Sequence, residues 1–189
     1  MALRHAVLAA LLDDEYSGYQ LAKAFDISVA NFWHALPQQL YAELARLEAD
    51  GLVAGREVVQ ETRPNKRLFR VTDAGRAELE RFAEAASKPS SIRDDLLVKV
   101  QTADRIGTGP VIEQLEQRAA AAGAKLELLG TLLHHMRGDT DEAEYLLRGE
   151  RIGRYLTCLR GLAFEREHRD WCLRTAAVLR ERQQTDAQR

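Results

Sequence analysis

The sequence predicts a mainly α-helical protein with two parts: N-terminal helices with a small two-stranded β element, then an all-helical, coiled-coil-like domain. Three observations predict this. Apolar residues recur at helical spacing through most of the 189 residues. Runs rich in β-branched residues interrupt that spacing between residues 52 and 71. The segment Ser87–Ser91 has no large apolar residue and contains a proline, which disfavours a continuous helix.

We therefore expect an N-terminal domain over residues 1–88, a helical domain over residues 89–183 and a frayed tail over residues 184–189. The charged fraction of 30% and the hydrophobic fraction of 46% are typical of a soluble globular protein. The formal net charge is −2, and the pI near 6.2 argues against a generally basic nucleic-acid binder. Any DNA site must therefore be a local one.

Location follows from what the sequence lacks. No apolar run approaches the roughly 20 residues of a membrane-spanning helix, so we expect no membrane partner. Cys158 and Cys172 are the only cysteines, too few for a disulfide framework. The expected location is the reducing cytoplasm.

The first elements of the N-terminal domain are three helices. The first covers residues 3–13, where leucine and valine recur on one face. Ser17 and Gln20 have capping-box spacing and predict the start of a second helix that reaches Phe25. Pro37 suits the first position of a third helix, and Gly51 suits the left-handed position after its end.

The β element follows directly. Residues 52–59 and 66–71 read as two short strands, and residues 60–65 between them read as a hairpin loop. Thr72 then caps a helix that runs to about residue 86. Three helices, a two-stranded hairpin and a further helix are the order of a winged helix-turn-helix.

The third helix has an outer face suited to a DNA groove. With Leu40, Leu44 and Leu47 buried, 100° steps turn a low ridge outward, made of Gln38, Ala42, Ala45, Arg46 and Ala49. Small residues permit close approach, and a glutamine can bond an adenine edge at two points, with its amide oxygen accepting and its amide NH2 donating. An ordinary solvated, alanine-rich helix predicts the same pattern, because alanine favours helices.

Positive charge is concentrated in the hairpin. Residues 56–70 hold five basic and two acidic residues, whereas residues 1–88 hold 11 basic and 13 acidic ones. Arg63, Lys66 and Arg67 cluster at the expected tip, where long cations can contact a phosphate backbone. A charged strand edge that resists aggregation is the alternative interpretation.

Short motifs across residues 3–82 resemble the PadR family of transcriptional regulators in their order and spacing. The motifs are Gly18-Tyr19-Gln20-Leu21, Phe32-Trp33, Pro37, Leu40-Tyr41, Arg46-Leu47-Glu48, Gly51-Leu52-Val53, Lys66-Arg67, Phe69-Arg70, Val71-Thr72 and Gly75-Arg76. The C-terminal half is similar to the helical domain of the longer members, most clearly at Arg160-Gly161-Leu162-Ala163. The resemblance covers most of the chain.

The resemblance implies a dimeric, usually repressing, winged-helix protein. Two copies of the third helix would enter adjacent major grooves of a palindromic operator in double-stranded DNA, and the wings would hold the flanking backbone. With the outward-facing Arg46, the implied DNA-binding residues are Ser17, Tyr19, Gln38, Gln39, Tyr41, Arg63, Lys66 and Arg67. One departure is the wing tip Arg63-Pro64-Asn65, where many members have a Gly-Gly-like turn, and this predicts a stiffer wing.

Trp33 has two interpretations. A tryptophan is most often a core or interface residue. Members of the family often bind flat aromatic compounds near their dimer interface, so the resemblance also makes Trp33 a candidate contact for a small aromatic effector that relieves repression.

The C-terminal domain contains a heptad seam. Eight apolar residues follow one another at alternating steps of three and four: Ile112, Leu115, Ala119, Ala122, Leu126, Leu129, Leu133 and Met136. We expect this seam to lie between two subunits, or to pack both between subunits and within one, because two-fold dimers are common and match paired half-sites. A seam wholly inside one chain is the alternative. Gly123 and Gly130 beside it indicate close packing or bending. A last helix is expected over residues 142–182, with a candidate break at Gly149–Gly153.

Other function classes have weaker support. His168 and Cys172 share a helix face, and Cys158 lies near it, but a structural metal site needs four ligands, and no motif supplies them. The sequence contains no CxxC, GxSxG or HExxH motif and no phosphate-binding glycine loop. We therefore expect no metal, no cofactor and no catalysis. The main alternative to DNA binding is a helical interaction module whose winged domain binds protein, which the acidic balance favours.

Overall fold

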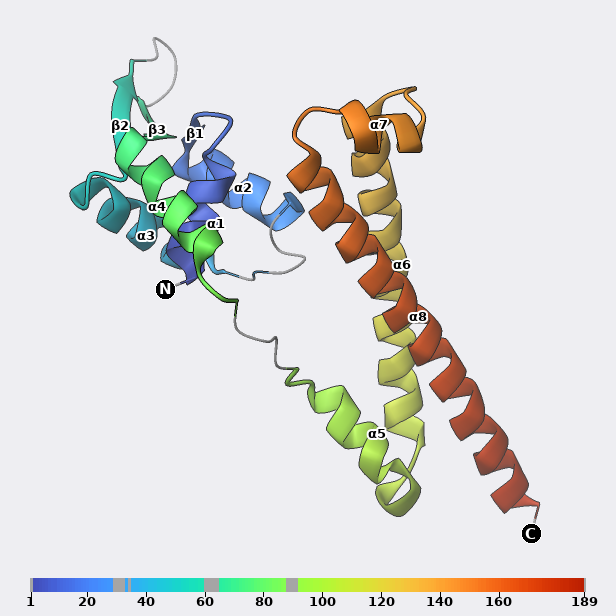
Figure 1. Cartoon of the computed structure of the whole chain (residues 1–189). Helices are drawn as coiled ribbons and strands as arrows, with labels where there is room; N and C mark the ends of the chain where they lie inside the picture. The colour runs from blue at the N-terminus through green and yellow to red at the C-terminus, as the bar shows by residue number, and fades with distance from the viewer. Residues whose placement is uncertain (1, 29–32, 34, 60–64, 88–91, 189) are drawn as a thin grey trace. The chain divides into compact units, whose positions relative to one another are not determined.

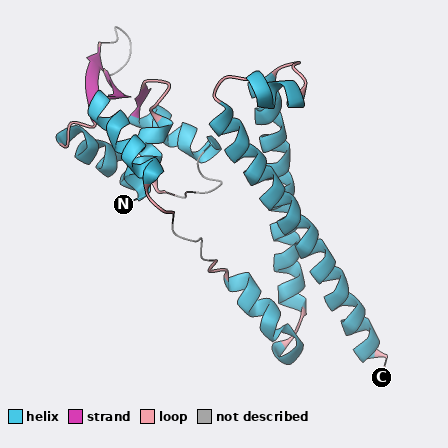
Figure 2. Ribbon diagram, viewed as in Figure 1, coloured by secondary structure: helices cyan, strands magenta, loops and turns pink. Residues whose placement is uncertain are grey.

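The structure, a computed structural model, describes residues 2–28, 33, 35–59, 65–87 and 92–188. The chain divides into two compact units, Met1–Pro89 and Ser90–Arg189 (Figure 1). Most described residues are helical, and the strands belong to the first unit (Figure 2). The predicted mainly α-helical class is therefore confirmed.

The first unit is a winged helix-turn-helix. Its helices are α1 (Ala2–Ala10), α2 (Gly18–Ser28), α3 (Pro37–Ala49) and α4 (Asp73–Glu84). Its strands β1 (Tyr16–Ser17), β2 (Val53–Val58) and β3 (Lys66–Val71) form an antiparallel sheet in the order β1-β3-β2. The predicted order of three helices, hairpin and helix is confirmed. The sequence did not predict β1, because two residues are too short to give an alternating pattern.

Local caps set the ends of these elements. The Ser17 backbone N–H donates to the Gln20 side-chain oxygen at 3.0 Å, and the Gln20 N–H donates to Ser17 Oγ at 3.2 Å, which is the predicted capping box. Gly51 has a φ of +72°, the left-handed conformation expected after α3. Thr72 caps α4 by accepting the Gly75 N–H at 3.1 Å.

One apolar core holds the first unit together. It draws on α1, α2, α3 and the inner residues of the wing, and its buried members are Val7, Leu8, Leu11, Leu21, Phe25, Ala35, Leu40, Leu44, Leu47, Val53 and Val71. Because α3 contributes Leu40, Leu44 and Leu47 to this core, its opposite face is turned to solvent.

The second unit is built on two long helices. Its elements are α5 (Asp95–Ile106), α6 (Gly109–Arg137), α7 (Glu142–Arg148) and α8 (Ile152–Ala187). Helices α6 and α8 lie side by side and run in opposite directions (Figure 1). The break between α7 and α8 lies within the predicted Gly149–Gly153 segment. Residues 184–187, where we expected a frayed tail, form the last turn of α8.

The heptad seam of α6 packs inside the chain. Ile112, Leu115 and Ala119 are buried with Cys172 and Ala176 of α8 and with residues of α5. Leu129 and Leu133 are buried with Tyr155 and Cys158 of α8. Ala122 is also buried, and Leu126 and Met136 are partly buried. Within the chain, α8 folds back and packs its own apolar stripe on this face of α6.

The candidate metal ligands of the second unit take part in packing within the chain. Cys172 is fully buried in the apolar cluster, and burial raises the pKa of its thiol. His168 stacks between Phe164 and Trp171 along α8.

The two glycines beside the seam lie in open space. A Cβ added at Gly123 or Gly130 would meet no atom of the described residues within 4 Å, so the expected close packing at these glycines does not occur there.

Over the described part of the chain, none of the helices combines the length and apolar character needed to cross a bilayer.

Candidate nucleic-acid interface

Helix α3 presents the predicted ridge to solvent. Gln38, Ala42, Ala45, Arg46 and Ala49 are all exposed, opposite the buried leucines. The three alanines have no atoms beyond Cβ, so the backbone of α3 can approach another surface closely. Arg46 keeps 73% of its side chain exposed while it contacts Glu43 at 3.3 Å.

The first turn of α3 distinguishes its two glutamines. The Leu36 backbone N–H donates to Gln39 Oε1 at 2.9 Å, so the Gln39 side chain satisfies the start of its own helix. Gln38 is exposed one position earlier. To contact a base edge with its oxygen, Gln39 would first have to break its hydrogen bond to the Leu36 N–H.

Tyr41 connects α3 to the start of α2. A Cβ on Gly18 would clash with the Tyr41 ring, so the ring lies directly against the Gly18 backbone. Tyr19, the next residue along α2, is 72% exposed. The start of α2 therefore presents Tyr19 to solvent beside the first turns of α3.

Strand β1 brings the start of α2 next to the wing. Tyr16 pairs with Phe69 and Ser17 pairs with Leu68 across the sheet. Ser17 is thus adjacent to β3, the strand that begins at Lys66. The sheet register, which sequence spacing does not reveal, brings these two parts of the predicted site together.

The wing carries exposed cations that have acidic neighbours. Arg67 Nη2 contacts Glu48 Oε1 of α3 at 2.7 Å, and the Arg67 guanidinium lies 5.7 Å from the centre of the Phe69 ring. A hollow of about 450 Å³ is lined by Gly55, Glu57, Asn65, Lys66 and Arg67. Arg63, also predicted to contact DNA, lies outside the described residues.

A second ion pair joins the wing to the segment before β1. Arg56 Nη2 of β2 contacts Glu15 Oε2 at 2.5 Å. The Arg56 hydrogen bond holds the pKa of Glu15 below its usual value, with smaller effects from the charges of Arg56 and Arg70. The carboxylates of Glu15 and Glu48 therefore offset part of the positive charge that the wing carries.

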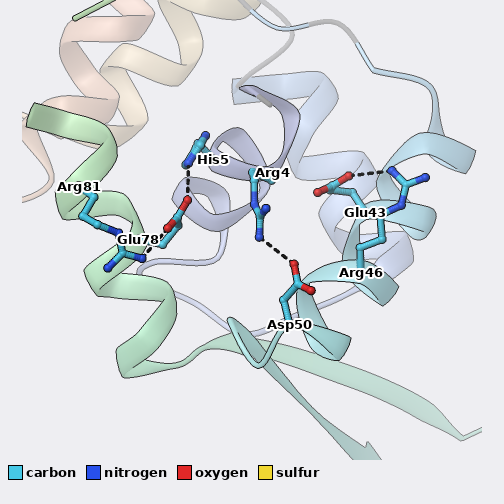
Figure 3. A network of polar contacts seen from close by, with 7 residues as sticks. All are labelled: Arg4, His5, Glu43, Arg46, Asp50, Glu78 and Arg81. Atoms are coloured by element: carbon cyan, nitrogen blue, oxygen red, sulfur yellow. Dashed lines mark hydrogen bonds and ion pairs between the residues drawn. The ribbon is translucent and has the colours of Figure 1, made fainter. Parts of the chain in front are cut away.

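Ion pairs also connect α1 to the end of α3 and to α4 (Figure 3). Arg4 of α1 contacts Asp50 at 2.9 Å, at the end of α3. His5 Nε2 of α1 lies 3.0 Å from Glu78 Oε1 of α4, and its ring stacks on Phe82 at 3.9 Å. These contacts hold α1 against the helices on both sides of the wing.

The predicted residues of the first unit form a connected surface. Ser17 ends β1 and Tyr19 lies in the first turn of α2. Gln38, Gln39, Tyr41 and Arg46 lie on α3, and Lys66 and Arg67 lie on the wing. The residues that sequence reasoning missed are the acidic partners Glu48 and Glu15 and the close-packed Gly55 and Gly18. Their partners are 19 to 41 residues away for the ion pairs, so no local spacing pointed to them.

Trp33 contributes to the core of the first unit. It is partly buried and packs against the apolar core between α2 and α3. Ala35, two residues later, is 5% exposed and belongs to the same core. Trp33 is therefore close in sequence and in packing to the start of α3.

Two family descriptions match consecutive parts of the chain. Residues 7–81 match the Transcriptional regulator PadR-like family, and residues 92–180 match the Virulence activator alpha C-term family. The first match covers the winged unit, and the second covers the helical unit.

Individual relatives match over nearly the full length. A probable transcriptional regulator of Mycobacterium tuberculosis is 32% identical over 192 residues, covering 96% of this chain and all of that protein. The negative transcriptional regulator PadR of Bacillus subtilis is 24% identical, covering 89% of this chain and 92% of its own.

Solved structures show the same fold. Bacillus subtilis PadR in complex with operator DNA matches with a TM-score of 0.75 and 23% identity, over 95% of this chain and 99% of that one. The same protein in complex with p-coumaric acid matches with a TM-score of 0.67 and 22% identity, over the same shares of the two chains. With the M. tuberculosis relative similar along its whole length, the chain belongs to the PadR-like family of transcriptional regulators.

Proposed function

We propose that this transcriptional regulator binds operator DNA in the cytoplasm as a homodimer and represses transcription. The observation that carries the proposal is the exposed ridge of α3 beside a cationic wing, in a chain with a net charge of −2. Charge concentrated at one surface attracts a phosphate backbone even when the whole molecule is weakly acidic. Regulators of this family are not enzymes, and the surface suits binding rather than catalysis.

Different parts of this surface would contact the bases and the phosphates of the DNA. The alanines let α3 enter a major groove, where the exposed Gln38 amide can reach a base edge. Lys66 and Arg67 of the wing, Ser17 at the end of β1 and Tyr19 of α2 would contact phosphates and fix the register of the protein on the duplex. Bacillus subtilis PadR, solved with operator DNA, supports this assignment through its shared fold.

A further surface besides the α6 seam is available for the dimer contact. The second unit exposes large apolar side chains on α5 and α8, among them Val98 at 62%, Leu156 at 51%, Leu173 at 51% and Val178 at 50%. Apolar side chains exposed in such number are typical of an interface. We infer that a second copy of the chain covers them.

An aromatic effector would act near α3. Trp33 packs on the core just before the helix, so a flat ligand that moved Trp33 would also move the first turn that carries Gln38. Bacillus subtilis PadR has been solved with p-coumaric acid, which supports a small aromatic carboxylic acid as the class of effector. Quenching of fluorescence by p-coumaric acid should fall in Trp33→Phe and persist in Trp171→Phe.

Salt-dependent DNA titration tests the proposed function. We expect the wild-type protein to bind a duplex that it selects from a random library, with an affinity that falls steeply as salt rises. Lys66→Ala should make the salt slope shallower by about 0.9 per protomer. Lys99→Ala, which removes an exposed cation of α5, is the control and should leave the slope unchanged. Equal slopes for wild type and Lys66→Ala would contradict the wing assignment.

A further inference from the structure

Glu48 lies at the junction between α3 and the wing. Its Oε1 accepts the Gly55 backbone N–H of β2 at 3.0 Å and accepts from Arg67 Nη2 of β3 at 2.7 Å. One carboxylate oxygen therefore contacts both strands of the wing. Glu48 keeps 28% of its side chain exposed and Arg67 keeps 58%, so the pair is open to solvent on one side.

Gly55 makes this contact possible. A Cβ at this position would lie 2.5 Å from Arg67 Nε and 2.6 Å from Glu48 Oε1, so any side chain would push the two charged groups aside. The Phe69 ring lies near the Arg67 guanidinium on the same strand. The sequence thus places a residue without a side chain where the ion pair approaches the backbone.

The pair is suited to exchange. An ion pair with an exposed arginine contributes little to stability, because water screens it. A DNA phosphate offers the guanidinium a charge-assisted, two-point contact that the single Glu48 oxygen does not provide. Exchanging Glu48 for a phosphate would leave Glu48 bonded to the Gly55 N–H, so the wing would stay attached to α3.

We propose that Glu48 is a positioning residue that holds Arg67 in the unbound protein and releases it to a DNA phosphate on binding. Glu48 then has two functions: it attaches the wing through Gly55, and it competes with DNA for Arg67. The inference rests on the proposed function, since it requires that the wing meets DNA.

Glu48→Gln separates the two functions. The glutamine oxygen can still accept the Gly55 N–H, but the charge that holds Arg67 is gone. We expect the full-length variant to bind the selected duplex about fivefold more tightly than wild type. Glu48→Ala loses the acceptor as well, so it should bind more weakly than Glu48→Gln. Thermal unfolding would first establish that each variant is folded.

The double variant Glu48→Gln/Arg67→Ala identifies the route. If Glu48 acts through Arg67, Glu48→Gln should give no gain in the Arg67→Ala background. A fivefold gain that persists without Arg67 would mean general repulsion between Glu48 and DNA and would overturn the inference. Glu84→Gln, which removes an exposed charge from α4, is the matched control and should bind as wild type does.

The outcomes also distinguish the two levels of the argument. If wild type binds the duplex and Glu48→Gln does not bind it more tightly, the exchange is wrong and the proposed function stands. If wild type shows no salt-dependent binding to any duplex, both are wrong.

Discussion

Gln38 and Gln39 are neighbours of the same type with different roles. Both side chains are exposed at the first turn of α3, but only the Gln39 oxygen accepts the Leu36 N–H. A residue engaged in a cap contributes to folding, and an exposed one is available for recognition. The structure therefore moves the expected base contact from the pair of glutamines toward Gln38.

The two alanine variants should separate these roles. Gln38→Ala should relax the base preference at one position of the selected site and leave stability unchanged. Gln39→Ala should lower the free energy of unfolding by about 0.5 kcal/mol, since it removes one exposed hydrogen bond. Selection from a randomised duplex and urea unfolding measure the two effects. An unchanged preference in Gln38→Ala would remove it from base recognition.

Glu78 gives the first unit a pH-dependent contact. Hydrogen bonds from Arg81 and then from His5 lower its pKa below the ordinary 4.5. A carboxyl group with a lowered pKa in the folded state stabilises the fold above pH 4.5, and this contribution is lost as the pH falls through the folded-state value.

Glu78→Gln should therefore be less stable than wild type near pH 7 and equally stable in strong acid. Urea unfolding at a series of pH values measures the difference, with the exposed Glu84→Gln on the same helix as control. A stability difference between wild type and Glu78→Gln that stayed constant over the whole pH range would show that the charge of Glu78 is not involved.

At the scale of elements, short sequence patterns predict where the helices begin and end, but they do not predict which residues far apart in the sequence contact each other. The Ser17–Gln20 box, the Gly51 turn and the Thr72 cap each depend on residues a few positions apart, so the sequence predicts them. Strand β1 and the Glu48–Arg67 pair depend on the register of the sheet, which no short pattern contains.

Gly75 shows how closely α4 packs on the wing. A Cβ at this position would clash with the Leu52 carbonyl oxygen, which is backbone and cannot rotate away. Gly75→Ala should therefore lower the free energy of unfolding by about 1–3 kcal/mol. Gly123→Ala, in open space on α6, should instead raise it by about 1 kcal/mol, because alanine favours a helix. Thermal unfolding checks both, and equal effects at the two glycines would contradict this packing.

At the scale of the whole molecule, the sequence predicts which face of α6 is apolar but not what covers it. The heptad pattern of α6 is the same whether α8 or a second chain packs on it. The structure shows α8 on that face. It also shows that α5 and α8 leave further apolar side chains exposed, and we propose that a second copy packs on these.

Val98→Lys tests this interface without disturbing the core. Val98 is 62% exposed, so a lysine there should leave the fold intact but place a charge in the dimer contact. We expect monomers in light scattering and a loss of affinity for paired half-sites. A variant that remained dimeric would exclude this part of α5 from the interface.

The most direct test of the account is selection of bound duplexes from a random library by the wild-type protein. If two copies of α3 enter adjacent major grooves, the selected DNA should contain two inverted half-sites whose centres are about 10 base pairs, or a multiple of that, apart. Selected sequences without inverted symmetry, or no enrichment at all, would contradict a dimeric DNA-reading function for this chain.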